Sequence, residues 1–175
     1  MSRNAFNYSL DFKSVNFKKH PKLYRIGRGE QGVLLVQPYK SELLPHWKFK
    51  TEKIAKESAK RIFKLFKHYL KNKDFIGADM ARKYLQMGFT RARRYANHKN
   101  GKKYKIGKKR KIEVLEYPYS SGSRNKGNGI IKREKDSLIN EKAKAAKVFK
   151  TYWFKAKNHT GYLRQKSVFR KKYYH

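Results

Sequence analysis

The chain has 175 residues, and its 47 Lys and Arg against 12 Asp and Glu give a formal net charge of +35. Repulsion of this size opposes a compact state and favours a polyanionic partner, which is most often nucleic acid, although anionic membrane or acidic protein would also fit. The absence of Cys excludes disulfides and thiolate metal sites. No apolar run approaches the roughly 18 residues of a membrane span, and the opening MSRNAFNYSLDF lacks the apolar segment of a secretory signal. We therefore expect one domain that is not secreted and has no membrane partner.

Most of the cations are Lys, which favours contacts that do not depend on sequence. Lys is a point charge that suits phosphates in any sequence context, whereas Arg is the better reader of base edges. An AT-rich genome would also enrich Lys, so codon use is an alternative cause of this choice. Codon use does not explain the shortage of acids.

Residues 24–40, YRIGRGEQGVLLVQPYK, contain three glycines in the spacing G-x-G-x-x-G, which can cradle a nucleotide phosphate. The dinucleotide motif needs a helix at its end, but the apolar run VLLVQP follows Gly32 and stops at Pro38. The kinase loop lies between strands, but this chain lacks the H-R-D and D-F-G motifs. We therefore expect a β-hairpin whose glycines supply positive φ, with no cofactor. Its candidate nucleic-acid contacts are Arg25 and Arg28.

Residues 51–71, TEKIAKESAKRIFKLFKHYLK, predict an amphipathic helix with Thr51 as its N-cap. Its apolar face comprises Ile54, Ser58, Ile62, Leu65, Phe66 and Tyr69. The opposite face carries a stripe of candidate phosphate contacts, Lys53, Lys56, Lys60, Lys64, Lys67 and Lys71. A solvated helix face usually mixes charge signs, whereas here only two acids, both off the stripe, dilute the lysines. We interpret the stripe as facing phosphates, and an ordinary solvated face is the alternative.

Residues 74–87 predict a second helix that stops at Gly88, and residues 90–101 predict a third. Two helices around a glycine turn are compatible with a helix-turn-helix that places Arg91, Arg94 and Asn97 on a recognition helix. The signature is loose, so we favour a plain helical hairpin that brings arginines to phosphates. The candidate contacts are Arg91, Arg93 and Arg94.

The segment 99–111 is basic, with eight Lys or Arg among thirteen residues. It predicts a mobile loop that leads into a short strand at 112–115. The candidate contacts here are Lys99, Lys102, Lys103, Lys105, Lys108, Lys109, Arg110 and Lys111. The composition of residues 120–129, SSGSRNKGNG, predicts a flexible linker.

The C-terminal part predicts a last helix from Asp136 to about Lys157. Its outer face repeats the lysine pattern, and its candidate contacts are Lys144, Lys147 and Lys150. In the tail, NHTGYLRQKSVFRKKYYH, aromatic residues alternate with cations. We expect them to dock on the core, while stacking on bases is the alternative.

No catalytic or metal-binding pattern stands out. The acids are scattered, and Asp74 and Asp79 are five residues apart, which places them on different faces of a helix. The six histidines show no metal-ligand spacing. We therefore expect no catalytic residues, metal or enzymatic activity, with a nuclease built from distant carboxylates as the alternative.

Two blocks, YRIGRGEQGVLLVQPYKSELLPHWKFKT and GADMARKYLQMGFTRARRYANHKNGKKY, resemble the domain-of-unknown-function family 4385, which occurs in bacteria, phages, fungi and giant DNA viruses. The resemblance covers about residues 6–117 and supplies no catalytic residues. The additional lysines and the basic part beyond about residue 120 resemble giant-virus members. That likeness implies a role in genome packaging.

Together these features predict an α+β fold, a small helix-rich domain with a short β-hairpin or sheet and basic flexible loop and tails. We expect a globular domain at 1–117, a flexible linker at 118–134 and a basic helix and tail at 135–175. The predicted function is sequence-independent binding and compaction of double-stranded DNA, by phosphate neutralisation and bridging of duplex segments. The alternatives are an RNA- or ribosome-associated protein and a nucleic-acid-processing enzyme. Self-association would also allow compaction, and the expected location is a virion or nucleoid if the protein is viral, and otherwise intracellular.

Overall fold

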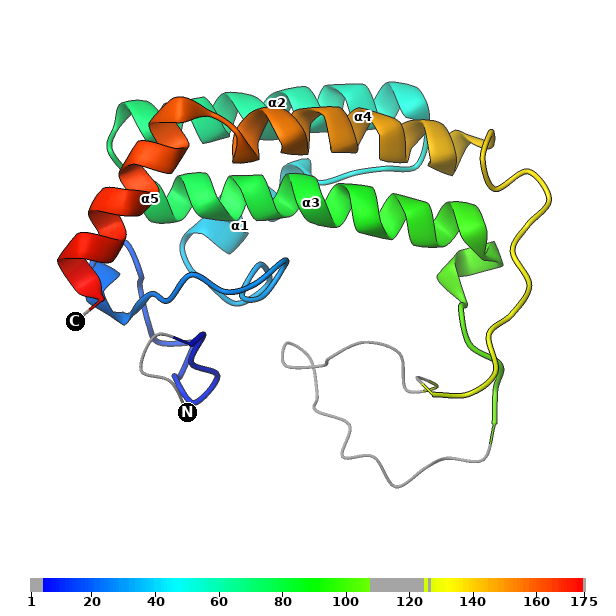
Figure 1. The fold of residues 1–175 in the computed structure, drawn as a ribbon, viewed down its shortest axis with the longest axis horizontal. Helices are drawn as coiled ribbons and strands as arrows, with labels where there is room; N and C mark the ends of the chain where they lie inside the picture. Colours follow the sequence, from blue (N-terminus) through cyan, green and yellow to red (C-terminus); the bar gives the residue numbers. More distant parts are fainter. Residues whose placement is uncertain (1–4, 108–124, 126, 175) are drawn as a thin grey trace.

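Three long helices form the body of the molecule (Figure 1). They are α2 (Glu52–Lys71), α3 (Phe75–Asn97) and α4 (Glu141–Lys157). The computed structural model describes residues 5–107, 125 and 127–174. Figure 1 shows α2 and α4 side by side, running in the same direction, with α3 antiparallel to both. At their common start the carboxylate of Glu141 accepts a hydrogen bond from the backbone N–H of Glu52 at 3.0 Å, and farther along Phe63 meets Tyr152 with ring centroids 5.5 Å apart.

The predicted helix over residues 51–71 is confirmed, with Thr51 as its N-cap. The Thr51 hydroxyl accepts a hydrogen bond from the backbone N–H of Ile54 at 3.2 Å, which satisfies a donor that the helix start leaves unpaired. The residues that α2 buries recur every three or four positions: Ala55, Ser58, Ala59, Ile62, Phe66 and Tyr69. This periodicity turns one face of α2 to the core and leaves the lysine face outside.

The prediction of two helices around Gly88 is wrong, because α3 continues through this glycine to Asn97. A Cβ at Gly88 would lie 2.2 Å from a ring carbon of Phe149 in α4. Glycine is therefore needed here for the close approach of two helices, and it does not end the first one. One continuous helix also excludes the helix-turn-helix in this part of the chain.

The predicted β-hairpin is also wrong, and so is the α+β class. Among the described residues there are only two isolated bridges, Asn16 with Gln37 and Tyr104 with Ile130, and no strand. The apolar run after Gly32 folds into turns, in which the N–H of Val36 donates to the carbonyl of Gly32 at 3.1 Å. Its residues Val33, Leu35 and Val36 are buried. The run therefore contributes side chains to the core and forms a compact turn that leads into α1. The part of the chain that the structure describes is all-α.

Short helices complete the N-terminal half and the end of α3. They are η1 (Pro21–Leu23), α1 (Tyr39–Leu43), η2 (Leu44–His46) and η3 (Lys99–Gly101). Residues 24–40 are called the glycine segment below. The positive φ expected of its glycines is present at Gly29 (54°) and Gly32 (82°). The glycines therefore supply left-handed backbone, in a turn rather than in a hairpin.

The last predicted helix begins later than expected, at Glu141, because Asn140 is its N-cap and accepts from the N–H of Ala143 at 2.9 Å. The C-terminal tail forms a further helix, α5 (Thr160–Tyr173), which the sequence did not predict. Its aromatic residues Tyr162 and Phe169 are buried, which agrees with docking on the core.

Two further predictions fall partly or wholly on residues that the structure does not describe. The strand at 112–115 lies outside the described residues, as do residues 118–124 and 126 of the linker predicted at 118–134. In the residues that the structure describes, no helix combines the length and apolar character needed to cross a membrane.

Candidate nucleic-acid interface

The α2 lysine stripe, Lys53, Lys56, Lys60, Lys64, Lys67 and Lys71, lies on the solvent side of α2, and all six side chains are exposed. Lys56 pairs with Glu52 at 2.6 Å. The other five have no ion pair within the described part of the chain. At 1.5 Å per residue the stripe is about 27 Å long, a length over which duplex DNA carries about 16 phosphate charges.

The α4 helix, which packs beside α2, also carries exposed lysines. Lys144, Lys147 and Lys150 are exposed, and Lys144 pairs with Glu141 at 3.1 Å. The ammonium of Lys150 lies 5.8 Å from the ring centre of Phe89. Figure 1 shows α2 and α4 side by side, so the exposed lysines of the two helices lie on neighbouring elements.

The arginines at the end of α3 are mostly engaged within the protein. The Arg94 guanidinium donates to the carbonyl of Gly101 at 2.7 Å, and Arg93 donates to the side chain of Asn97 at 2.7 Å. Arg91 is exposed. Two of the three predicted arginine contacts therefore hold η3 and the end of α3 together.

The two predicted arginine contacts of the glycine segment, Arg25 and Arg28, lie in different environments. Arg28 is exposed. Arg25 is half-buried, donates to the carbonyl of Lys22 at 2.8 Å, and lies 5.3 Å from the ring centre of Tyr174. The structure therefore holds Arg25 against the C-terminal end of α5.

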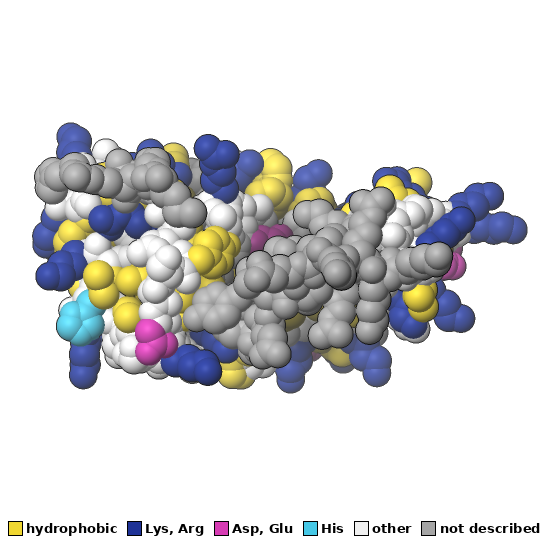
Figure 2. All heavy atoms as spheres, turned by 90° about the horizontal axis from the view of Figure 1, so that it is seen from below, with side chains coloured by type: hydrophobic (Ala, Val, Ile, Leu, Met, Phe, Trp, Pro, Cys, Tyr) yellow, Lys and Arg dark blue, Asp and Glu magenta, His cyan; other side chains and the backbone are white. Residues whose placement is uncertain are grey.

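A second group of cations follows α3, below the bundle in Figure 1 and across α3 from α2. Lys99, Lys102 and Lys105 are exposed, and Lys103 is half-buried beside Tyr104, with 5.4 Å from its ammonium to the ring centre. The other predicted contacts of this segment, Lys108, Lys109, Arg110 and Lys111, lie outside the described residues. Figure 2, seen from below, shows Lys and Arg around the rim of that side of the molecule and few acids.

A group of charges inside the bundle was missed from the sequence. This buried charge cluster consists of Asp79, Arg82, Lys83, Tyr24 and Tyr162. The Asp79 carboxylate accepts hydrogen bonds from the Tyr24 hydroxyl, from the Tyr162 hydroxyl at 2.7 Å and from the Arg82 guanidinium at 2.9 Å, with the Lys83 ammonium 3.8 Å away. Asp79 and Lys83 are both fully buried. Their spacing of four residues, in a part of α3 that also buries Ala78, Met80, Ala81 and Leu85, is the signal that could have revealed the pair.

The environment of the cluster shifts the pKa values of Asp79 and Lys83 in ways that reflect their pairing. Burial alone would raise the pKa of Asp79, but Arg82, Lys83 and the two tyrosine hydroxyls outweigh it and hold that pKa well below its usual range. Burial lowers the pKa of the Lys83 ammonium to about 8, although Asp79 opposes the shift. The ammonium also donates to the backbone carbonyl of Gln31 at 2.7 Å, which fastens the glycine segment to α3. The cluster is thus a structural anchor for this segment.

The chain belongs to the family described as Domain of unknown function (DUF4385), whose model matches residues 7–172 of the 175. This confirms the resemblance of the two sequence blocks and extends it through α4 and α5. No curated protein and no solved structure is significantly similar to the chain.

Proposed function

We propose that this protein binds double-stranded DNA without sequence preference and compacts it. The observation that carries the proposal is the α2 lysine stripe, in which five exposed lysines on one helix face have no ion pair within the described residues. Such a face would neutralise phosphates and release condensed counterions, which supplies affinity for any sequence.

The arginines of α3 support the absence of sequence readout. Reading base edges needs side chains that are free to reach into a groove, and Arg is the usual choice. Here Arg93 and Arg94 are engaged with neighbouring groups of the protein. The exposed lysines of α2 are point charges better suited to phosphates.

Compaction requires contact with two duplex segments at once. In Figure 1 the segment 99–107 lies on the other side of α3 from α2, and both segments carry exposed lysines. We propose that these surfaces bridge duplexes, and that the setting is a packaged genome in a virion or a nucleoid.

The first test measures the binding of a short duplex across a salt series. Binding through roughly 6–10 phosphates should make log K fall linearly with log salt, at a slope near −0.9 per contact. AT-rich and GC-rich duplexes should bind within a few-fold of each other. A shallow slope with strong discrimination, or a clear preference for structured RNA of equal charge, would overturn the proposal.

The second test removes each surface separately. The variant K53Q/K60Q/K64Q/K67Q should bind a short duplex more weakly, with a salt slope shallower by up to about 3.6. K99Q/K102Q/K105Q should retain most of the short-duplex affinity. Each variant should lose most condensation of long DNA, measured by light scattering, because one surface cannot hold a second segment.

The matched control is K13Q/K19Q/K132Q/K135Q, which removes four exposed lysines scattered over other parts of the chain. It should lower short-duplex affinity less than the α2 variant does. An equal loss would mean that net charge, and no particular face, determines binding. A parallel loss of binding and condensation in both surface variants would contradict bridging by a monomer.

A further inference from the structure

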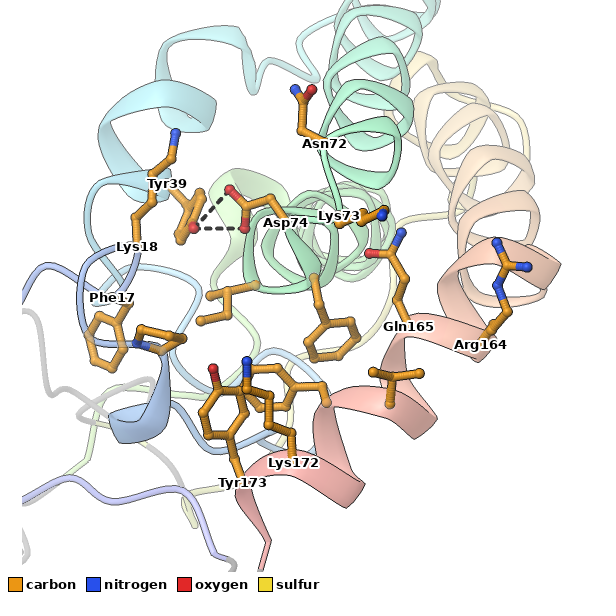
Figure 3. A pocket seen from close by; sticks show the side chains of 15 residues that line it. Phe17, Lys18, Tyr39, Asn72, Lys73, Asp74, Arg164, Gln165, Lys172 and Tyr173 are labelled. Carbon is orange, nitrogen blue, oxygen red and sulfur yellow. Dashed lines mark hydrogen bonds between the residues drawn. The ribbon is translucent and has the colours of Figure 1, made fainter.

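A groove of about 590 Å³ lies between α5, the α2–α3 turn and the N-terminal segment (Figure 3). Its volume is within the range of small-molecule sites. The groove is separate from the α2 lysine stripe, none of whose residues lines it, and Tyr39 is the one residue of the segment 24–40 in its lining. It is therefore a candidate site that the proposed DNA contacts do not use.

The floor of the groove is apolar and largely aromatic. Phe17, Phe75 and Phe169 are buried beneath it, and Phe169 lies 4.7 Å from Tyr173 between ring centroids. Tyr173 is only half-buried, and Val168 is 59% exposed. A planar ring could lie on this floor and cover apolar surface that now faces solvent.

The rim of the groove is cationic. Four basic side chains line it, with Asp74 as the one acid among its lining residues: Lys18, Lys73, Arg164 and Lys172. Figure 3 shows these cations around the opening, on three separate segments of the chain. The Asp74 carboxylate already accepts hydrogen bonds from the Tyr39 hydroxyl at 2.8 Å and from the N–H of Gly77 at 3.0 Å. The rim therefore favours an anionic group.

One polar atom of the lining is an unused acceptor. The Gln165 amide nitrogen donates to the carbonyl of Leu70 at 2.8 Å, which fixes the orientation of the side chain. Its oxygen is buried and has no hydrogen-bond partner among the described residues, and it points into the groove in Figure 3. A buried acceptor of this kind is stabilised by a ligand that brings an N–H donor.

The backbone of Lys73 gives a second, independent indication. Lys73 has φ of 56°, in the turn where α2 ends and the N–H of Asp74 donates to the carbonyl of Tyr69 at 2.9 Å. Glycine is the usual residue at this position of a helix end, because it adopts the left-handed conformation without cost. The chain instead places a lysine there, on the rim of the groove, which suggests that its charge matters more than the strain.

We propose that this groove binds a nucleotide, with the base on the aromatic floor and the phosphate at the cationic rim. The occupant must combine a planar ring, an N–H donor for Gln165 and a negative charge, and a nucleotide has all three. The same chemistry is offered by a free nucleotide and by an unpaired nucleotide at the end of a DNA strand. The proposal does not depend on DNA binding by the α2 lysine stripe.

The experiment titrates the full chain with dAMP by calorimetry at near-physiological salt. Because a strongly basic protein attracts any anion, the comparison ligand is deoxyribose 5-phosphate, which has the same phosphate but no base. We expect dAMP to bind at least ten-fold more tightly. Equal affinity for the two ligands would overturn the proposal.

The variant that tests the site is Lys73→Gly. It should raise the melting temperature, because glycine suits the positive φ, and should weaken dAMP binding about ten-fold. Lys71→Gln removes a nearby charge that does not line the groove, and it should leave dAMP binding unchanged. An equal loss in both variants would mean that the groove is not the site.

Competition then distinguishes the two sources of nucleotide. If the site takes strand ends, a duplex with an unpaired terminal nucleotide should displace dAMP at lower concentration than a blunt duplex of equal charge. If it takes free nucleotides, the two duplexes should compete equally. K53Q/K60Q/K64Q/K67Q should still bind dAMP, so failure of DNA binding by the stripe and failure of the groove are separable.

Discussion

The molecule holds lysines in two opposite settings: six lie exposed on the outer face of α2, and Lys83 lies on the buried side of α3. On α2, six exposed lysines have one acidic partner among the described residues, Glu52. Inside α3, Lys83 and Arg82 share the buried carboxylate of Asp79, and the Lys83 ammonium also donates to a backbone carbonyl. The comparison suggests that cations needed by the fold are buried and paired, while the exposed ones are available to a partner.

The largest expected effect comes from removing the charge of Asp79, the one carboxylate paired with Arg82 and Lys83 among the described residues. Asp79→Asn leaves Arg82 and Lys83 buried without a counter-charge, which should lower the free energy of unfolding by about 3–5 kcal/mol. Urea unfolding followed by circular dichroism measures this loss. The control Lys64→Gln, on the outer face of α2, should change stability by less than about 0.5 kcal/mol. Similar midpoints for Asp79→Asn and the native protein would mean that the cluster does not anchor the fold.

A second prediction uses the low pKa of Lys83. Burial lowers this pKa to about 8 in the folded protein, against about 10.4 for an unfolded lysine. Between these values the unfolded state binds more protons than the folded state, so stability rises with pH. Below pH 8 both states are protonated, and the cost of burying the charge is fully present. We expect a gain of up to about 2 kcal/mol between pH 8 and 10.

The control for this pH dependence is Lys83→Met, which removes the titrating group and retains an apolar stem of similar length. Surface lysines also begin to lose protons toward pH 10, and their contribution is common to both proteins. The difference in slope between the native protein and Lys83→Met therefore isolates Lys83. Parallel stability curves would show that this lysine does not titrate in the window.

The two regions also differ in how far the sequence predicts them. The α2 lysine stripe follows from local rules, since the cap at Thr51 and the spacing of apolar residues act within one helix. The buried charge cluster depends on Tyr24 and Tyr162, which lie 55 and 83 residues from Asp79 in the chain. A single sequence does not reveal partners at such distances.

The same reasoning explains the two errors in the prediction of the fold. Gly88 has the local pattern of a helix stop, but its role is set by the Phe149 ring from α4. The run after Gly32 has the composition of a strand, but no partner strand reaches it among the described residues, and its turns pack against the core. In both places a contact distant in sequence overrides the local preference.

A third prediction asks how tightly the glycine segment is held. Gly32 has φ of 82°, and a Cβ there would lie 2.5 Å from the Phe6 ring, whereas Gly29 has φ of 54° and a Cβ there would lie 3.7 Å from the Gln86 side-chain nitrogen, an ordinary contact distance. Gly29→Ala should cost about 1 kcal/mol for the left-handed backbone. Gly32→Ala should cost about 2 kcal/mol, because overpacking is added. DNA affinity per folded molecule should not change in either variant, and unequal DNA affinities would place the segment in the interface.

The smallest expected change in stability concerns the one acid paired within the α2 lysine stripe. Glu52 and Lys56 are an exposed pair four residues apart at 2.6 Å, and such pairs contribute about 0.3–0.5 kcal/mol. Glu52→Gln should therefore leave the melting temperature almost unchanged.

Glu52→Gln should nevertheless raise duplex affinity several-fold at low salt, because Lys56 becomes available to phosphate and a repelling charge is removed. The salt slope should steepen by up to about 0.9, the value of one additional contact. Glu134→Gln makes the same change of charge at an exposed residue at the end of the predicted linker, so it controls for net charge alone. If both variants gained equal affinity, the stripe would be no closer to the DNA than the rest of the surface. A gain confined to Glu52→Gln would instead show that phosphates lie along α2.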